Sequence, residues 1–292
     1  MNEALLIQRK KILSYNNNIQ SEWWWSLDTS LEIIHRCLNN NRYCIIDDFL
    51  LDNECNNVYD EVQAAYQQGL LNSRGSIAGG RKGDDTLKVE DESIRNDTLG
   101  YFDGNEDEWP SGSNQGGLTR ALDKINTIVY ELRDHNKNND NNNELKNVRT
   151  RSRAMITCYA GNGSKYTRHC DNPIRNGRKL TVLLYLNKNW DTTTDGGCLR
   201  LYEPYNTSNH NHYIDIKPTF NSLVLFWSDT RCPHEVLPCY KHRFAVTCWF
   251  IDSVEKKEAD DNERIEKEQN TDSTSDVKTD SSITTTDVFE LD

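Results

Sequence analysis

The sequence lacks the segments and cysteine patterns typical of secreted or membrane-bound proteins. It has no run of about 18 apolar residues that could cross a membrane. The first residues, MNEALLIQRKKIL, do not follow the charged and then apolar order of a signal peptide. Its nine cysteines are scattered, without a CxxC pair or the spacing of a small disulfide framework. We therefore expect reduced cysteines, no membrane partner, and a location in the cytoplasm, the nucleus or both.

A basic surface is also missing. The 46 acidic residues outnumber the 34 basic ones, which gives a formal net charge of −12, and no stripe of lysine and arginine appears. Residues 253–292 carry 13 acids and 5 bases, or −8 of this total. Because a nucleic-acid backbone repels an acidic protein, we expect no nucleic-acid partner.

The chain divides into three regions by composition. Residues 1–40 are expected to form a helical extension, and residues 41–252 a domain with enough apolar residues for a substantial core. Residues 253–292, which include TDSTSDVKTDSSITTTD, are polar and acidic and are expected to be disordered. A polar stretch at 72–116 inside the domain is typical of a binding loop.

Helices are expected in the first half of the chain and strands in the second. Apolar residues at helical spacing predict helices over 31–38, 52–71 and 118–132. From about residue 149 the pattern changes to short β-branched and apolar runs, at 155–159, 165–171, 179–186, 198–202, 213–216, 223–227 and 244–251. Strands that follow helices, without alternating with them, predict a mainly β, α+β fold. An antiparallel sandwich or barrel of the jelly-roll or cupin class, with helices outside, fits this order.

Two histidines and one aspartate could hold a metal ion. His169 and Asp171 are two positions apart, so on a strand their side chains point to the same face. His234 follows a second strand and a turn, which can place it opposite the first pair. Two histidines and one carboxylate form the facial triad of Fe(II) oxygenases, which leaves three coordination positions open. A solvated His–Asp pair is the alternative.

Arg243 lies nine residues after His234 and begins an alternating strand. Arg243, Ala245, Thr247 and Trp249 share one face of it, which we expect to point inward. A buried arginine is costly unless it is paired. It is either part of a structural salt bridge or the group that holds the far carboxylate of a 2-oxoglutarate bound at the metal.

Four segments resemble the prolyl hydroxylases that act on hypoxia-inducible factor α subunits, the Egl-nine family. They are RHCDNPIRNGRKLTVLLYLNKNW, GGCLRLYEP, LVLFWSDTRCPHEVLPCY and HRFAVTCWFID. The match runs from about 155 to 201 and resumes to about 252, with a weaker match from 43 through the 90–104 loop. The resemblance implies a double-stranded β-helix core at about 149–252 with supporting N-terminal helices. It also implies the use of Fe(II), 2-oxoglutarate, O2 and L-ascorbate.

The resemblance also implies a role for each matching residue. The iron ligands are His169, Asp171 and His234, and the 2-oxoglutarate site consists of Arg243, Tyr185, Tyr159 and Thr247, walled by Met155, Leu199, Val236 and Trp249. The residues near the peptide substrate are Tyr166, Arg178, Arg95 and Asp97. We expect Asp97, in a loop over the peptide, to pair with Arg178. For the aromatic and aliphatic residues, ordinary core packing is the alternative.

The implied reaction is trans-4-hydroxylation of a proline in a hypoxia-inducible factor α-type protein, by a monomer that acts as an oxygen sensor. A proline of Skp1, a ubiquitin-ligase adaptor, is the alternative target, and a non-catalytic cupin-like binding module is an alternative from another class. Trp249 and the acidic charge disfavour a nucleic-acid demethylase. Cys170, between two ligands, could sense oxidation. A second metal site at His210 and His212 is disfavoured because no third ligand is near.

Overall fold

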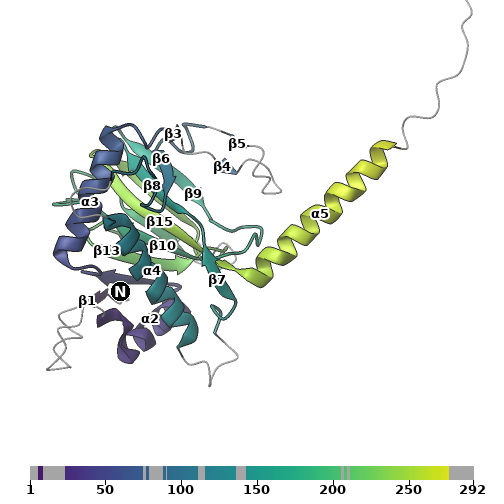
Figure 1. Cartoon of the computed structure of the whole chain (residues 1–292), viewed down its shortest axis with the longest axis horizontal. Coiled ribbons are helices and arrows are strands. Elements are labelled where there is room, and N and C mark those ends of the chain that lie inside the picture. Colours follow the sequence, from purple (N-terminus) through teal and green to yellow (C-terminus); the bar gives the residue numbers. More distant parts are fainter. Residues whose placement is uncertain are drawn as a thin grey trace, which may run out of the picture.

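The computed structural model describes residues 6–8, 24–74, 77–78, 88–89, 91–110, 116–135, 143–204, 207–208 and 211–275. Two antiparallel sheets form the body of the protein, with a parallel pair only at the edge strand β1 (Figure 1). The larger sheet has nine strands in the order β1-β2-β13-β10-β15-β8-β6-β3, with β7 also pairing with β15. The smaller one has four strands in the order β12-β11-β14-β9. This arrangement of antiparallel sheets confirms the expected mainly β fold.

The strands of the larger sheet are β1 (Leu6–Gln8), β2 (Tyr43–Asp47), β3 (Ser73–Arg74), β6 (Thr98–Phe102), β7 (Val148–Arg151), β8 (Ala154–Tyr159), β10 (Arg178–Tyr185), β13 (Ser222–Trp227) and β15 (Arg243–Asp252). Those of the smaller sheet are β9 (Ser164–His169), β11 (Leu199–Tyr202), β12 (Tyr213–Ile216) and β14 (His234–Cys239). A separate pair is formed by β4 (Ile77–Ala78) and β5 (Lys88–Val89). The strands β8, β10, β13 and β15 are almost continuously buried, because sheet and helices cover them on both sides.

Three helices pack on the larger sheet. They are α2 (Asp28–Asn41), α3 (Asp52–Gln67) and α4 (Gly117–Asp134), and a short 3-10 helix, η1 (Trp24–Ser26), precedes α2. The apolar positions of α4 that repeat at helical spacing, from Leu118 to Leu132, are fully buried in the core shared with the sheet. The buried carboxylate of Glu61 on α3 accepts hydrogen bonds from the backbone N–H groups of Gly117 and Leu118 (2.7 and 2.8 Å), which satisfies the start of α4. The prediction of helices outside a β core is confirmed.

The expectation of a wholly helical N-terminal extension is wrong for residues 6–8, which form β1. This strand pairs in parallel with β2, with Ile7 opposite Ile46. The open edge of β2 offers unpaired backbone groups, and pairing there outweighs the local preference for a helix. The rest of the stretch before residue 24 lies outside the described residues.

The expectation that the chain is disordered after residue 252 is also wrong for residues 253–275. They form helix α5 (Ser253–Ser275), which projects away from the two sheets (Figure 1). Asp252 Oδ1 accepts hydrogen bonds from the N–H groups of Val254 and Glu255 (2.9 and 3.1 Å), and pairs such as Lys256–Asp260 lie one turn apart. A carboxylate cap and i,i+4 pairs favour a helix in a polar sequence. Residues 276–292 lie outside the described residues.

No helix in the described part of the chain has the length and apolar character that a membrane crossing requires.

Candidate metal centre and its pocket

Strand pairing brings the two candidate histidine ligands together. His169 ends β9 and His234 begins β14, and the register of these strands places the two residues directly opposite each other. Their ring centroids are 4.3 Å apart. Asp171 lies two residues past the end of β9, which ends two residues earlier than the strand expected over 165–171. Asp171 Oδ1 is 3.7 Å from His169 Nε2 and 3.8 Å from His234 Nε2. Among the described residues, this is the one cluster with metal-ligand geometry, and its three candidate ligand atoms lie within 4.8 Å of one another.

Hydrogen bonds fix the orientation of all three side chains. Nδ1 of His169 is 2.8 Å from Thr167 O, and Nδ1 of His234 is 2.9 Å from Cys232 O. A carbonyl only accepts, so each Nδ1 carries the proton and each Nε2 turns a lone pair toward the centre. Thr181 donates its hydroxyl to Asp171 Oδ2 at 2.7 Å, which leaves Oδ1 facing the histidines. The carboxylate and both imidazoles are therefore preorganised for one cation.

Burial and charge set the protonation states that metal binding needs. Burial, together with the neighbouring His234, lowers the pKa of His169 to about 3. Burial alone would raise the pKa of Asp171, but His234, His169 and the Thr181 hydrogen bond hold it below its usual value. A neutral imidazole beside an ionised carboxylate is the state that binds a divalent metal at neutral pH.

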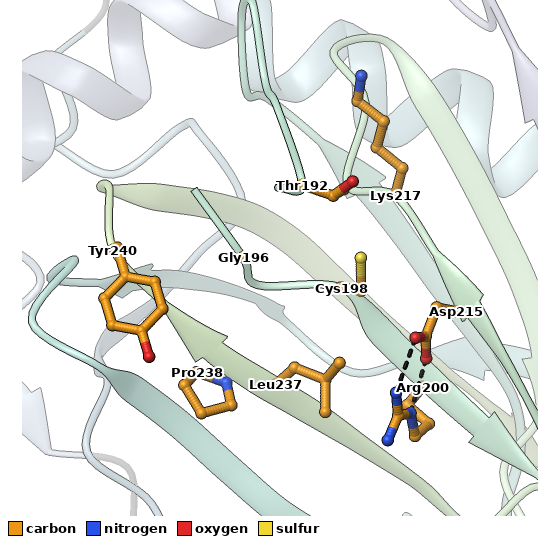
Figure 2. Close-up of a pocket in the computed structure, with 9 residues that line it drawn as sticks. All are labelled: Thr192, Gly196, Cys198, Arg200, Asp215, Lys217, Leu237, Pro238 and Tyr240. Atoms are coloured by element: carbon orange, nitrogen blue, oxygen red, sulfur yellow. Dashed lines mark hydrogen bonds and ion pairs between the residues drawn. The ribbon is translucent and has the colours of Figure 1, made fainter. Parts of the chain in front are cut away.

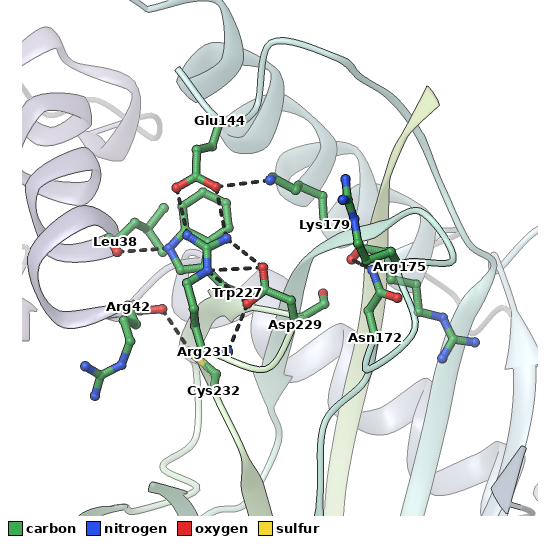
Figure 3. A network of polar contacts seen from close by, with 12 residues as sticks. Leu38, Arg42, Glu144, Asn172, Arg175, Lys179, Trp227, Asp229, Arg231 and Cys232 are labelled. Atoms are coloured by element: carbon green, nitrogen blue, oxygen red, sulfur yellow. Dashed lines mark hydrogen bonds and ion pairs between the residues drawn. The ribbon is translucent and has the colours of Figure 1, made fainter. Parts of the chain in front are cut away.

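Ion pairs hold the turn that leads to His234. Arg231 donates to both carboxylate oxygens of Glu144 (2.7 and 2.9 Å) and also to Asp229, and Lys179 reaches the same Glu144. Figure 3 shows this cluster over the ring of Trp227, with Arg231 Cζ 4.5 Å from the ring centroid. The cluster ties the segment before β7 to the β13–β14 turn.

Arg243 points into the interior beside two tyrosines. Its side chain is buried, and Nε donates to Gly197 O at 2.8 Å. The guanidinium carbon is 5.1 Å from the ring centroid of Tyr159 and 5.0 Å from that of Tyr185. Among the described residues, no carboxylate forms a salt bridge with Arg243, and the buried hydroxyl of Tyr185 has no hydrogen-bond partner. A buried cation and an unsatisfied donor fit an anionic, oxygen-bearing ligand, and they argue against a structural salt bridge.

Gly197 makes room for the stem of Arg243. It has a φ of +66°, and a Cβ there would lie 2.8 Å from Cys239 Cβ and 3.1 Å from Arg243 Cδ. A larger residue would therefore push against the side chain that Gly197 also anchors through its carbonyl oxygen. This position was not identified from the sequence, although the adjacent glycines before β11 were a signal of close backbone approach.

The expected pocket walls lie in separate groups. Leu199 and Val236 face each other across β11 and β14, and Val236 packs in one cluster with Tyr159. Thr247 is buried between Met155 of β8 and Leu183 of β10 in the sheet register. Met155 and Trp249 pack with Leu99 in another cluster, on the side of Arg95 and Arg178.

The residues expected at the peptide lie against the metal centre, but one predicted pair is wrong. Tyr166 stacks on His169 with centroids 3.6 Å apart, and the Arg95 guanidinium lies 4.6 Å from the Tyr166 ring. Asp97 forms a bidentate pair with Arg95 (2.5 and 2.8 Å) in place of the expected pair with Arg178. Arg178 instead lies over the Trp249 ring at 4.4 Å and donates to Asp171 O at 3.2 Å. Arg95 pairs with Asp97 because it lies only two residues away and its planar guanidinium can bind both carboxylate oxygens.

Two other residues of the centre were not identified from the sequence. Thr181 binds Asp171, and its hydroxyl is 2.8 Å from that of Ser228. Thr181 lies four residues before Tyr185 on β10, so alternation places it on the face already assigned to the pocket. That alternation was the available signal.

A hollow on the outer face of the smaller sheet contains none of the candidate site residues (Figure 2). Arg200 and Asp215 form a bidentate pair across it (2.7 and 2.8 Å). His212, directly before β12, is exposed, and His210 lies outside the described residues.

Comparisons with known proteins agree with this geometry. Residues 154–251 match the family described as the 2OG-Fe(II) oxygenase superfamily. The human protein called prolyl hydroxylase EGLN3 is 36% identical over 230 residues, which are 79% of this chain and 87% of that protein. The hypoxia-inducible factor prolyl hydroxylase of Caenorhabditis elegans is 34% identical over 228 residues, 78% of this chain but only 29% of that protein. The chain thus spans less than a third of the worm protein and 62% of Egl nine homolog 1 of Rattus norvegicus.

Solved prolyl hydroxylase structures are also similar to this chain. A prolyl hydroxylase of Trichoplax adhaerens, solved with a peptide of the hypoxia-inducible factor oxygen degradation domain, is 31% identical. It superimposes with a TM-score of 0.66 over 82% of this chain and 97% of that one. A Pseudomonas putida prolyl-4-hydroxylase, with 20% identity and a TM-score of 0.57, shares the fold.

Proposed function

The chain belongs to the Egl nine prolyl hydroxylases within the 2OG-Fe(II) oxygenases, and we propose that it is a peptidyl-proline 4-hydroxylase that senses oxygen. Its substrate is a specific proline in a hypoxia-inducible factor α-type protein. The observation that carries the proposal is the facial triad with both Nε2 atoms turned inward, together with a buried arginine that has no acidic partner among the described residues.

The side chains present fit the cofactors that this reaction needs. Nε2 of His169, Oδ1 of Asp171 and Nε2 of His234 would hold Fe(II). Arg243 would hold the far carboxylate of 2-oxoglutarate, with Tyr185 and Tyr159 beside it. When bound, Fe(II) with 2-oxoglutarate and O2 supplies the oxidation that adds one oxygen atom to proline and releases succinate and CO2. L-Ascorbate is typical of the family.

The protein's own residues bind, orient and exclude water. Thr181 fixes which carboxylate oxygen of Asp171 faces the metal, and the carbonyls of Thr167 and Cys232 fix the imidazoles. The hydroxyl of Tyr159 is a donor at neutral pH, as in any tyrosine, and burial, with a smaller effect from the charge of Asp97, raises its pKa well above the usual value. The buried side chains of Leu199, Val236, Thr247, Met155 and Trp249 would keep water from the cosubstrate.

The peptide would bind beside Tyr166, Arg178 and the Arg95–Asp97 pair, next to the metal centre. We assign the oxygenase domain to residues 41–252, and we expect a monomer located in the cytoplasm or the nucleus.

Mass spectrometry of peptides incubated with the protein, Fe(II), 2-oxoglutarate and ascorbate tests the proposal. We expect one proline of a hypoxia-inducible factor degradation peptide to gain one oxygen atom, with an equal amount of succinate released. Oxidation of a Skp1 peptide alone would keep the chemistry and replace the substrate. A protein that binds the metal but oxidises neither peptide would contradict the proposal.

A further inference from the structure

The loop that carries Asp171 is held from outside by the first turn of α5. This loop, residues 171–178 and here called the ligand loop, begins at Asp171 and ends at Arg178. It follows β9 and runs to the first residue of β10, and α5 follows β15 on the larger sheet. Two elements distant in the sequence therefore meet beside the metal centre.

Glu255 makes the central contact. Its side chain is 14% exposed, and its Oε1 accepts a hydrogen bond from Asn172 Nδ2 at 2.7 Å and from Gly177 N at 3.2 Å. Arg175 Nε lies 3.8 Å from the other carboxylate oxygen. One carboxylate from α5 thus binds both ends of the turn inside the ligand loop.

Close packing fixes α5 against the same turn. Gly177 has a φ of +98°, and a Cβ there would lie 2.7 Å from Lys256 Cβ and 2.9 Å from Lys256 Cα. The N–H of Asp252, which caps α5, donates to Gly177 O at 2.8 Å. The helix start and the loop therefore fit each other at backbone distance, which leaves little freedom for either to move alone.

The contact continues to the metal ligand through hydrogen bonds. Asn172, the residue after Asp171, donates from its backbone to Ser228 O at 2.7 Å and from its side chain to Arg178 O at 2.7 Å. Ser228 in turn is bonded to Thr181, which holds Asp171 Oδ2. Figure 3 shows Asn172 and Arg175 near the Asp229 turn. Glu255 thus binds Asn172 and Gly177, which are the chain neighbours of Asp171 and Arg178.

We propose that Glu255 is a positioning residue, through which α5 holds the ligand loop in the geometry that binds the metal. The inference rests on the proposed role of Asp171 as a metal ligand. Since α5 projects from the domain, displacing its first turn would loosen both Asp171 and Arg178. The C-terminal helix then has a function in the site although it touches no ligand.

The affinity for Mn²⁺ tests the role of Glu255, because Mn²⁺ binding can be measured without turnover. We expect Glu255→Ala in the full chain to raise the Kd for Mn²⁺ about fivefold or more, because groups that orient metal ligands commonly change affinity by roughly ten- to a hundredfold. Glu255→Gln keeps the Oε1 acceptor, so we expect its Kd to stay within about twofold of the wild type. The exposed Glu258, three residues further along α5, gives the matched control Glu258→Ala, with no expected change.

Thermal unfolding of each variant separates misfolding from misplacement of the loop. If Glu255→Ala does not fold, Glu255→Asp takes its place, since it keeps the charge but is one methylene too short to reach Asn172. A folded Glu255→Ala or Glu255→Asp with wild-type Mn²⁺ affinity would overturn the inference. A wild-type protein that does not bind Mn²⁺, or binds it as well after His169→Ala, would instead contradict the proposed metal site.

Discussion

The metal-binding end and the peptide-facing end of the site are held by different kinds of contact. His169 and His234 are neighbours in the register of β9 and β14, so backbone pairing determines their distance. Arg95 and Arg178 reach the site through long side chains, which are held by an ion pair with Asp97 and by aromatic rings. Strand pairing fixes the geometry of the metal-binding end, whereas the geometry of the peptide-facing end depends on which charged groups lie close enough to pair. Loss of a side chain should therefore have the largest effects at the metal end.

Removing a metal ligand should have the largest effect. We expect His234→Ala to abolish turnover below detection and to weaken Mn²⁺ binding, because two ligands remain where three were. Succinate release and Mn²⁺ titration measure the two effects. His212→Ala, at an exposed histidine, is the control and should match the wild type. Normal turnover in His234→Ala would contradict the assignment of His234 as a metal ligand.

The cosubstrate clamp should come next. Arg243→Lys keeps the charge but loses the planar fork, so we expect the KM for 2-oxoglutarate to rise about ten- to a hundredfold, or roughly 1.4–2.8 kcal/mol. Steady-state succinate formation gives this value. Arg200→Lys alters an arginine in the outer hollow that forms a bidentate pair with Asp215, and it should leave this KM unchanged. Equal KM values for Arg243→Lys and the wild type would place the cosubstrate elsewhere.

At the peptide-facing end, a double-mutant cycle should separate two possible partners of Asp97. For Asp97→Ala with Arg95→Ala, we expect a coupling of about 1–3 kcal/mol in the free energy of unfolding, because the pair is buried and bidentate. With Arg178→Ala, Asp97→Ala should be additive within about 0.5 kcal/mol. Urea unfolding of the single and double variants measures both. Strong coupling to Arg178 would restore the pair that the sequence resemblance implied.

The smallest effect is expected at the Glu144–Arg231 pair. Both side chains are about a third exposed, so screening by water should limit the loss for Glu144→Gln to about 1 kcal/mol or less in the free energy of unfolding. The KM for the peptide should not change. A loss of several kcal/mol, measured by urea unfolding, would mean that this cluster holds His234 far more tightly than its exposure suggests.

The sequence predicted best the features that follow from the alternation of side chains along strands and from the pairing of strands that are distant in the sequence. The inward direction of Arg243, the strands around it and the meeting of His169 with His234 all follow from residue spacing. The partner of Asp97 could not be predicted, because two arginines were within reach and only the folded loop decides between them. Helix α5 was missed because its polar composition resembles a disordered tail, while its cap and its contact with Asn172 are visible only in three dimensions.

We propose that the triad and Arg243 together hold Fe(II) and 2-oxoglutarate for hydroxylation of a peptide proline. Quantifying succinate and oxidised proline in the same reaction, with a hypoxia-inducible factor degradation peptide, tests it most directly. We expect one oxidised proline for each succinate formed, and neither product with His169→Ala. Succinate released at the same rate without the peptide, and no oxidised proline, would contradict it.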